Sequence, residues 1–175
     1  MSDADTRLGK WVETVSALAT RFEQGFEARF GYLPGENRVV SVSVDALSLA
    51  DGMGLPGELL ALYSYFDEVT LPDLGNGIFV GSLAWVVDGI RGNLPTRVCG
   101  AVEDSIVVFG SDGGGALIAL SSSGRGVYKL SGGALVGSVY DVDERGFRTV
   151  SHDLWGFLAW IREELRATTD GDPRA

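Results

Sequence analysis

A thiol and an imidazole are the first candidates for chemistry in this chain of 175 residues. Cys99 is its one cysteine and His152 its one histidine, so a nucleophile activated by a base would have to use this pair. Nothing in the sequence around Cys99 activates its thiol, and His152 is expected at the start of a helix, where the dipole disfavours imidazolium. One cysteine excludes an internal disulfide, and the pair excludes a zinc site with several Cys and His ligands. We therefore expect no catalytic residue, no metal and no cofactor.

Two loop motifs resemble ligand-binding loops but lack essential residues. Residues 110–115 (GSDGGG) form a glycine cluster, yet a phosphate-binding loop needs a lysine and a hydroxyl residue that open a helix, and here a strand-like run follows. Residues 140–146 (YDVDERG) begin like a calcium loop, but Arg145 and His152 occupy positions that require oxygen ligands. We predict a tight hairpin turn with positive φ angles at the first motif and a charged hairpin turn at the second.

Carboxylates are the abundant functional groups of this chain. It has 24 acidic and 14 basic residues, a net charge of −10, which makes nucleic acid and anionic membranes poor partners. No Lys or Arg occurs in residues 39–90 or 98–124. These stretches predict either a merely solubilising acidic surface or a negative face that steers and holds a basic protein partner. For the second interpretation the candidate partner-binding residues are Asp67, Glu68, Asp73, Glu103, Asp104 and Asp112.

The elements that would position these groups follow from hydrophobic spacing. Apolar residues recur at helical intervals through residues 3–30, which predicts a long amphipathic helix. Residues 38–44 alternate branched apolar with small polar residues and predict a half-buried strand. A second helix is expected to begin with Pro56 at its first position and to stop before Pro72, with Phe66 on its buried side.

The chain after residue 75 is first rich in glycine and is then expected to form a last helix. From residue 75 to residue 146 glycines alternate with short β-rich runs, which predicts an antiparallel meander with strands near residues 78–80, 105–109, 116–120, 126–130 and 134–140. Residues 82–90 fit either a short helix or a strand. Ser151 is the expected N-cap of a last helix from His152 to about Arg166, and residues 168–175 are expected to fray.

The length of the chain fits one domain that buries an ordinary core without disulfides. No apolar run approaches the roughly 20 residues that cross a bilayer, and no charged-then-apolar leader opens the sequence. We therefore expect a cytoplasmic protein.

Three stretches, in this order, resemble the SUKH superfamily, which includes fungal regulators of cell-wall assembly and many bacterial immunity proteins. They are residues 54–63 (GLPGELLALY), 106–120 (IVVFGSDGGGALIAL) and 126–130 (GVYKL), with residues 150–165 as the closing helix. The resemblance implies a single α+β domain with a mostly antiparallel β-sheet, helices packed against it and no catalytic residues. An N-terminal helix in residues 1–35 would then pack on a SUKH-like domain in residues 36–167, followed by a tail in residues 168–175.

Bacterial domains of this kind bind a cognate toxin domain, often a nuclease, and block its active site. The resemblance therefore implies a non-enzymatic immunity protein whose acidic face fills a basic cleft. Two alternatives stay open. One is a regulatory or scaffold protein that recruits cellular partners, and the other is a small-molecule-binding domain with Trp85, Trp155 or Trp160 as a wall of its pocket. The sequence leaves a monomer and a homodimer equally open.

Overall fold

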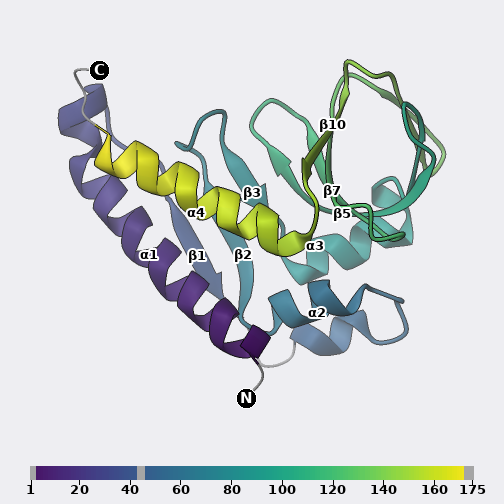
Figure 1. The fold of residues 1–175 in the computed structure, drawn as a ribbon, viewed down its shortest axis with the longest axis horizontal. Coiled ribbons are helices and arrows are strands. Elements are labelled where there is room, and N and C mark those ends of the chain that lie inside the picture. Colours follow the sequence, from purple (N-terminus) through teal and green to yellow (C-terminus); the bar gives the residue numbers. More distant parts are fainter. Residues whose placement is uncertain (1–2, 43–45, 172–175) are drawn as a thin grey trace.

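Two long helices lie side by side and cover one face of a β-sheet (Figure 1). The computed structural model describes residues 3–42 and 46–171. Helix α1 (Asp3–Phe30) has 28 residues and confirms the predicted amphipathic helix. Helix α4 (Leu154–Asp170) lies along it near the other end of the chain.

Helices α1 and α4 run in the same direction. Trp11, early in α1, donates its indole N–H to the carbonyl of Leu158, early in α4, at 2.7 Å. Further along, Arg21 pairs with Asp170 at 2.8 Å. Both helices bury their apolar stripes in the main core, where the side chains also come from the sheet.

Within the described residues, ten strands form one sheet with two branches that meet at the long strand β5 (Asp104–Asp112). In the first branch every strand is antiparallel to its neighbours. Its order is β1 (Arg38–Ser41), β2 (Phe66–Leu71), β3 (Ile78–Val80), β5, β6 (Leu117–Ser121), β7 (Val127–Leu130) and β10 (Phe147–Ser151). The second branch joins the beginning of β5 to β4 (Arg97–Gly100), β9 (Val139–Val142) and β8 (Ala134–Val136). Strands β4 and β9 pair in parallel.

The branched sheet separates two cores. Alternate side chains of β5 point to opposite faces, so Val107 and Phe109 belong to the main core under the helices. Ile106 and Val108 belong to a smaller core, which also buries Tyr128 and is formed largely by the curled strands at the right of Figure 1. The predicted fold class, a single α+β domain with a mostly antiparallel sheet and packed helices, is confirmed.

The second predicted helix is shorter than expected. Helix α2 (Gly57–Tyr63) has Pro56 as its N-cap, not as its first residue, and the chain then enters β2 at Phe66. The helix stops before Pro72 as predicted, but the prediction that it includes Phe66 is wrong. The apolar residues of β2 are buried, and its aromatic and β-branched residues favour the extended backbone.

The segment that fits either a helix or a strand is helical. Helix α3 (Leu83–Asp88) is capped by Ser82, whose hydroxyl accepts the N–H of Trp85 at 3.2 Å. It continues into the irregular turn η2 (Gly89–Asn93) and packs beside the short 3₁₀-helix η1 (Ala46–Ala50).

Helix α4 begins and ends later than predicted. Its N-cap is Asp153, whose Oδ1 accepts the N–H of the third helical residue at 2.6 Å, whereas Ser151 ends β10. The chain expected to fray from residue 168 is helical as far as Asp170. One reason is that Arg29 of α1 donates to the Thr169 carbonyl at 2.8 Å and satisfies an acceptor at the helix end.

Four predicted strands are confirmed within a few residues, near 78–80, 105–109, 116–120 and 126–130. The run at 134–140 is instead the hairpin of β8 and β9, which turns at Gly137 with a φ of 61°. Residues 38–41 of the predicted strand 38–44 form β1, and residues 43–45 lie outside the described residues. Strands β4 and β10 were not predicted.

Within residues 3–42 and 46–171, none of the helices combines the length and the apolar character that a membrane crossing needs.

Candidate functional site

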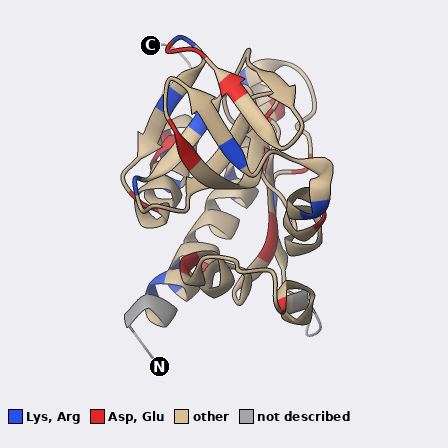
Figure 2. Cartoon of the chain, turned by 90° about the vertical axis from the view of Figure 1, so that its right-hand side faces the viewer, with Lys and Arg blue, Asp and Glu red and all other residues tan. Residues whose placement is uncertain are grey.

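The six predicted carboxylates do not form one acidic face. Asp104 and Asp112 mark opposite ends of β5, about 26 Å apart at roughly 3.3 Å per residue. Glu103 alone of the six is exposed, and it lies 3.9 Å from Arg97. Figure 2 shows basic residues interleaved with acidic ones on the side of the molecule that lies at the right of Figure 1. The other five carboxylates are half-buried and form hydrogen bonds or ion pairs within the chain. Most of the predicted partner-binding residues therefore stabilise the fold.

Asp67 and Asp73 bind segments that are distant in the sequence, the start of α3 and the residues before β1. Asp67 is an extra residue at a bulge in the pairing of β1 with β2. Its Oδ1 accepts the N–H of Leu83 at 3.1 Å and so holds the start of α3. Asp73 Oδ2 accepts hydrogen bonds from the N–H of Gly35 and the side-chain amide of Asn37, both at 2.7 Å.

Asp104 is the centre of a hydroxyl cluster. Its Oδ2 accepts hydrogen bonds from Ser121 at 2.6 Å, Tyr128 at 2.8 Å and Ser123 at 3.0 Å. Partial burial acts to raise the pKa of Asp104, but these hydrogen bonds outweigh it and hold the pKa below the ordinary value. The cluster ties the start of β5 to the turn between β6 and β7.

Asp112 organises the glycine-rich turn, which is a tight hairpin turn as predicted. Its Oδ1 accepts the N–H groups of Gly114 and Ala116, each at 2.9 Å, and Lys129 pairs with Oδ2 at 2.5 Å. Burial acts to raise the pKa of Asp112, and the bonds from Lys129 and the backbone outweigh it and lower the pKa. Of the three glycines in the turn, Gly115 has a positive φ, 84°.

Glu68 lies beside two aromatic residues in a shallow hollow of about 280 Å³. We call this hollow the Trp85 patch; it is lined by Glu68, Phe79, Gly81, Ser82, Trp85, Gly110 and Ser111. Strands β2, β3 and β5 bring these residues together, because Phe79 is in register with Thr70 on one side and Ser111 on the other. Its strand neighbours are buried, so alternation places Phe79 on the outer face of the sheet.

The backbone around Gly81 fixes the position of Trp85. A Cβ atom added to Gly81 would lie 2.3 Å from the indole ring, which shows that the ring rests against this glycine. The hydroxyl of Tyr63 donates to the Gly81 carbonyl at 2.8 Å. Burial raises the pKa of Tyr63, and the charge of Asp67 raises it further, so the phenol stays a donor.

The Trp85 patch combines an aromatic surface with an oriented carboxylate. Trp85 is 37% exposed, and Glu68 Oε1 accepts the hydroxyl of Thr70 at 2.8 Å. A guanidinium group can stack on an indole while it pairs with a carboxylate. The patch can therefore receive an arginine side chain from a protein partner.

A second hollow, the Trp160 cleft, has a volume of about 160 Å³. Its walls come from α4, β6 and the turn before β3, and they are mainly apolar, with Leu74, Ile118, Phe157 and Trp160 among them. The ion pair of Asp112 with Lys129 also lines it. An apolar hollow with a few polar groups is typical of small-molecule sites.

The Cys99 thiol, one of the groups first considered for chemistry, is not activated by its surroundings. Burial raises the pKa of the Cys99 thiol, and the charges of Asp141 and Glu103 raise it further, which disfavours the nucleophilic thiolate. The calcium-like motif is a turn in which Asp143 Oδ1 accepts two backbone N–H groups. It joins β9 to β10, which do not pair with each other, so the prediction of a hairpin there is wrong. In the described part of the chain, no three His, Cys, Asp or Glu side chains are grouped so that they could hold a metal ion.

Sequence reasoning found Glu68 and named Trp85, but it did not connect them. Their proximity depends on the pairing of β2 with β3 and on the capping of α3, which no short motif encodes. A comparison with protein-family models found no match to this chain, and a comparison with curated proteins found none either. The resemblance to the SUKH superfamily thus stays a prediction.

Proposed function

We propose that this protein is a non-enzymatic, immunity-type binding protein that neutralises a basic bacterial toxin domain by direct contact through the Trp85 patch. The observation that carries the proposal is the exposed indole of Trp85, held against Gly81 beside the oriented carboxylate of Glu68. Tryptophan is enriched among the residues that dominate binding energy at protein interfaces.

The chemistry of the patch favours a basic partner. Nuclease clefts hold phosphates with Lys and Arg, and such a cleft would present guanidinium groups to Glu68 and Trp85. The net charge of −10 would accelerate the encounter at low ionic strength. The resemblance to the SUKH superfamily supports the same role, with the cytoplasm as the proposed location and the toxin as the proposed partner.

The test is a binding measurement with matched tryptophan variants. Trp85 and Trp160 are both 37% exposed, but only Trp85 lines the patch. We expect Trp85→Ala to weaken binding of the proposed toxin domain by about 30-fold or more, the loss of a hot spot worth roughly 2 kcal/mol. Trp160→Ala should stay within about twofold of the wild type. The reverse order of the two variants would contradict the proposed surface.

A second candidate function is binding of a small molecule in the Trp160 cleft. The mainly apolar walls of the cleft, with the Asp112–Lys129 ion pair beside them, favour it. A metabolite screen that changes the fluorescence of the wild type but not that of Trp160→Phe would support this candidate. No response from either protein would dismiss it.

A further inference from the structure

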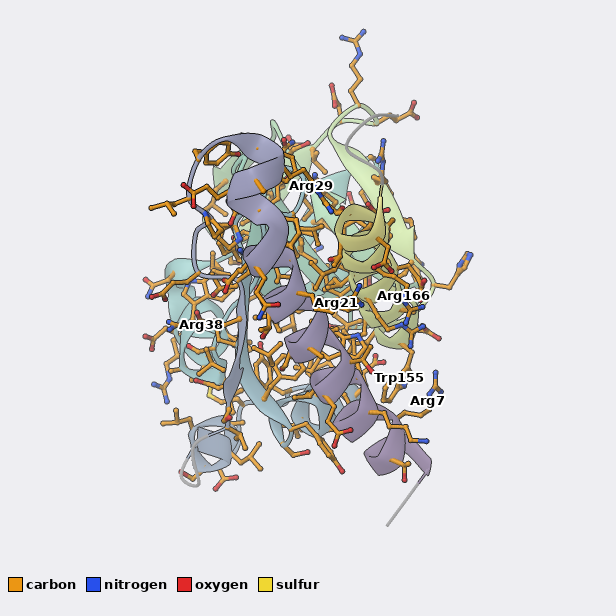
Figure 3. All side chains as sticks on the ribbon, turned by 90° about the vertical axis from the view of Figure 1, so that its left-hand side faces the viewer. Arg7, Arg21, Arg29, Arg38, Trp155 and Arg166 are labelled. Carbon is orange, nitrogen blue, oxygen red and sulfur yellow. The ribbon has the colours of Figure 1, made fainter. Side chains whose placement is uncertain are left out.

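A groove between α1 and α4 gathers basic side chains in an otherwise acidic chain. This α1–α4 groove has a volume of about 320 Å³. Arg7 and Lys10 of α1 line it together with Trp155 and Arg162 of α4. Figure 3 shows Arg7 and Trp155 close together on the side of the molecule where the two helices lie.

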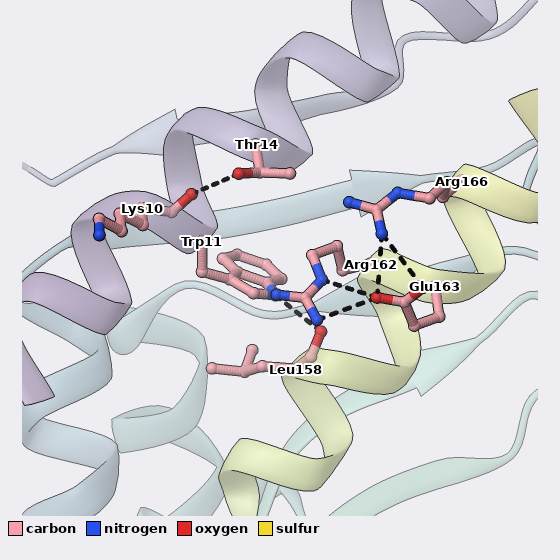
Figure 4. A network of polar contacts seen from close by, with 7 residues as sticks. All are labelled: Lys10, Trp11, Thr14, Leu158, Arg162, Glu163 and Arg166. Carbon is pink, nitrogen blue, oxygen red and sulfur yellow. Dashed lines mark hydrogen bonds and ion pairs between the residues drawn. The ribbon is translucent and has the colours of Figure 1, made fainter.

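A hydrogen bond between the two helices lies at the base of the groove. Buried Trp11 donates its indole N–H to the Leu158 carbonyl, so a polar contact joins the two helices at this level (Figure 4). Thr14 donates its hydroxyl to the Lys10 carbonyl within α1. Binding in the groove would therefore not require the helices to rearrange.

The positive charge of the groove is only partly balanced. Arg162 and Arg166 share one carboxylate, that of Glu163, at 2.9 and 3.4 Å (Figure 4). The guanidinium of Arg7 lies over the Trp155 ring, 4.6 Å from its centroid. Lys10 makes no ion pair with any residue in the described part of the chain.

The lining of the groove differs in charge from the rest of the molecule. None of the described residues that line it is acidic, although the chain carries a net charge of −10. Three cations from two helices thus line a common space, and Glu163, whose carboxylate pairs with Arg162, is not among the lining residues. Cations that converge in this way attract an anion of matching size.

We propose that the α1–α4 groove binds a compact soluble anion with two or more negative charges, such as a small phosphorylated molecule. Arg7 and Arg162, on opposite walls, would present guanidinium donors that fit two phosphate oxygens each. Lys10 would add a point charge, and Trp155 an apolar surface for the rest of the ligand.

The net negative charge of the chain favours a compact anion over an extended one as the ligand. Over the whole chain acidic residues outnumber basic ones, 24 to 14, and this net negative charge disfavours an extended polyanion. A compact anion would contact the three cations alone. This inference concerns a site separate from the Trp85 patch, and the two sites share no lining residue.

Calorimetric titration with inorganic pyrophosphate, at constant ionic strength, tests the proposal. We expect one site per chain in the wild type and at least about tenfold weaker binding in both Lys10→Gln and Arg162→Gln. Arg148→Gln is the matched control, because Arg148 is an exposed arginine on β10 that does not line the groove. Its affinity should stay within about twofold of the wild type. Circular dichroism verifies that each variant is folded.

Three results would overturn the proposal. The first is no heat of binding up to about 10 mM pyrophosphate, and the second is an equal loss of affinity in Arg148→Gln. The third is tighter binding of vesicles that contain phosphatidic acid, or of a penta-glutamate peptide, than of pyrophosphate, because either ligand would show that the groove does not select a compact soluble anion.

Discussion

The contact of Trp85 with Gly81 gives a prediction that depends on geometry alone. A Cβ atom at Gly81 would lie 2.3, 2.9 and 3.0 Å from three atoms of the indole, closer than side chains approach. The backbone of Gly81 does not have a positive φ, so alanine is otherwise acceptable there. We expect Gly81→Ala to lower the free energy of unfolding by about 1–3 kcal/mol, the range for forcing extra volume into a packed site.

The same substitution should be harmless once the ring is removed. In a Trp85→Ala background, Gly81→Ala should raise the free energy of unfolding by about 0.5–1 kcal/mol, because alanine restricts the unfolded chain more than glycine does. The two substitutions should therefore be coupled by at least about 1.5 kcal/mol.

Urea unfolding followed by far-ultraviolet circular dichroism measures this coupling without relying on tryptophan fluorescence. The control is Gly25→Ala, because an added Cβ at Gly25 on α1 meets no atom within 4 Å. Equal costs of Gly81→Ala in both backgrounds would refute the reasoning, since the indole would then not rest on Gly81.

Three further predictions concern the fold around the sites. Asp104→Ala should reduce stability at pH 7; because its pKa is lowered in the folded state, the difference from the wild type should shrink as the pH falls below about 4, which urea titrations at several pH values can follow. Gly126→Ala should cost at least about 2 kcal/mol, because φ is 121° and the added Cβ would lie 2.2 Å from the Ser151 carbonyl oxygen; a change under about 0.5 kcal/mol in chemical unfolding would contradict this. Asp153→Ala should lose about 1 kcal/mol with its N-cap bond, and an unchanged melting temperature would show that the bond contributes nothing.

The sequence predicts an element well where the signal is local and long. The apolar stripe of α1 repeats over 28 residues, and the strands around the glycine-rich turn are bounded by glycines that their turns require. The sequence predicts the boundary between two elements poorly where no proline or glycine separates them. Ser64 and Tyr65 separate α2 from β2 without a proline or glycine, so the apolar spacing predicts a helix that includes Phe66.

Partners distant in sequence explain the remaining differences. The parallel pairing of β4 with β9 joins segments about 40 residues apart and leaves no local pattern. The stretches without Lys or Arg, residues 39–90 and 98–124, are rich in carboxylates. A carboxylate can stabilise a turn of its own chain as well as bind a partner. Asp104 and Asp112 bind hydroxyls, backbone N–H groups and Lys129, and only the folded chain shows that these bonds exist.

The most direct test of the proposed function is the inhibition of the proposed toxin partner, measured in vitro as a function of the molar ratio of the two proteins. Neutralisation by contact predicts that inhibition is complete at one molecule of this protein per toxin, that it reverses on dissociation, and that Trp85→Ala shifts the inhibition curve while Trp160→Ala does not. Inactivation of many toxin molecules by one molecule of this protein, or no inhibition at any ratio, would contradict the account.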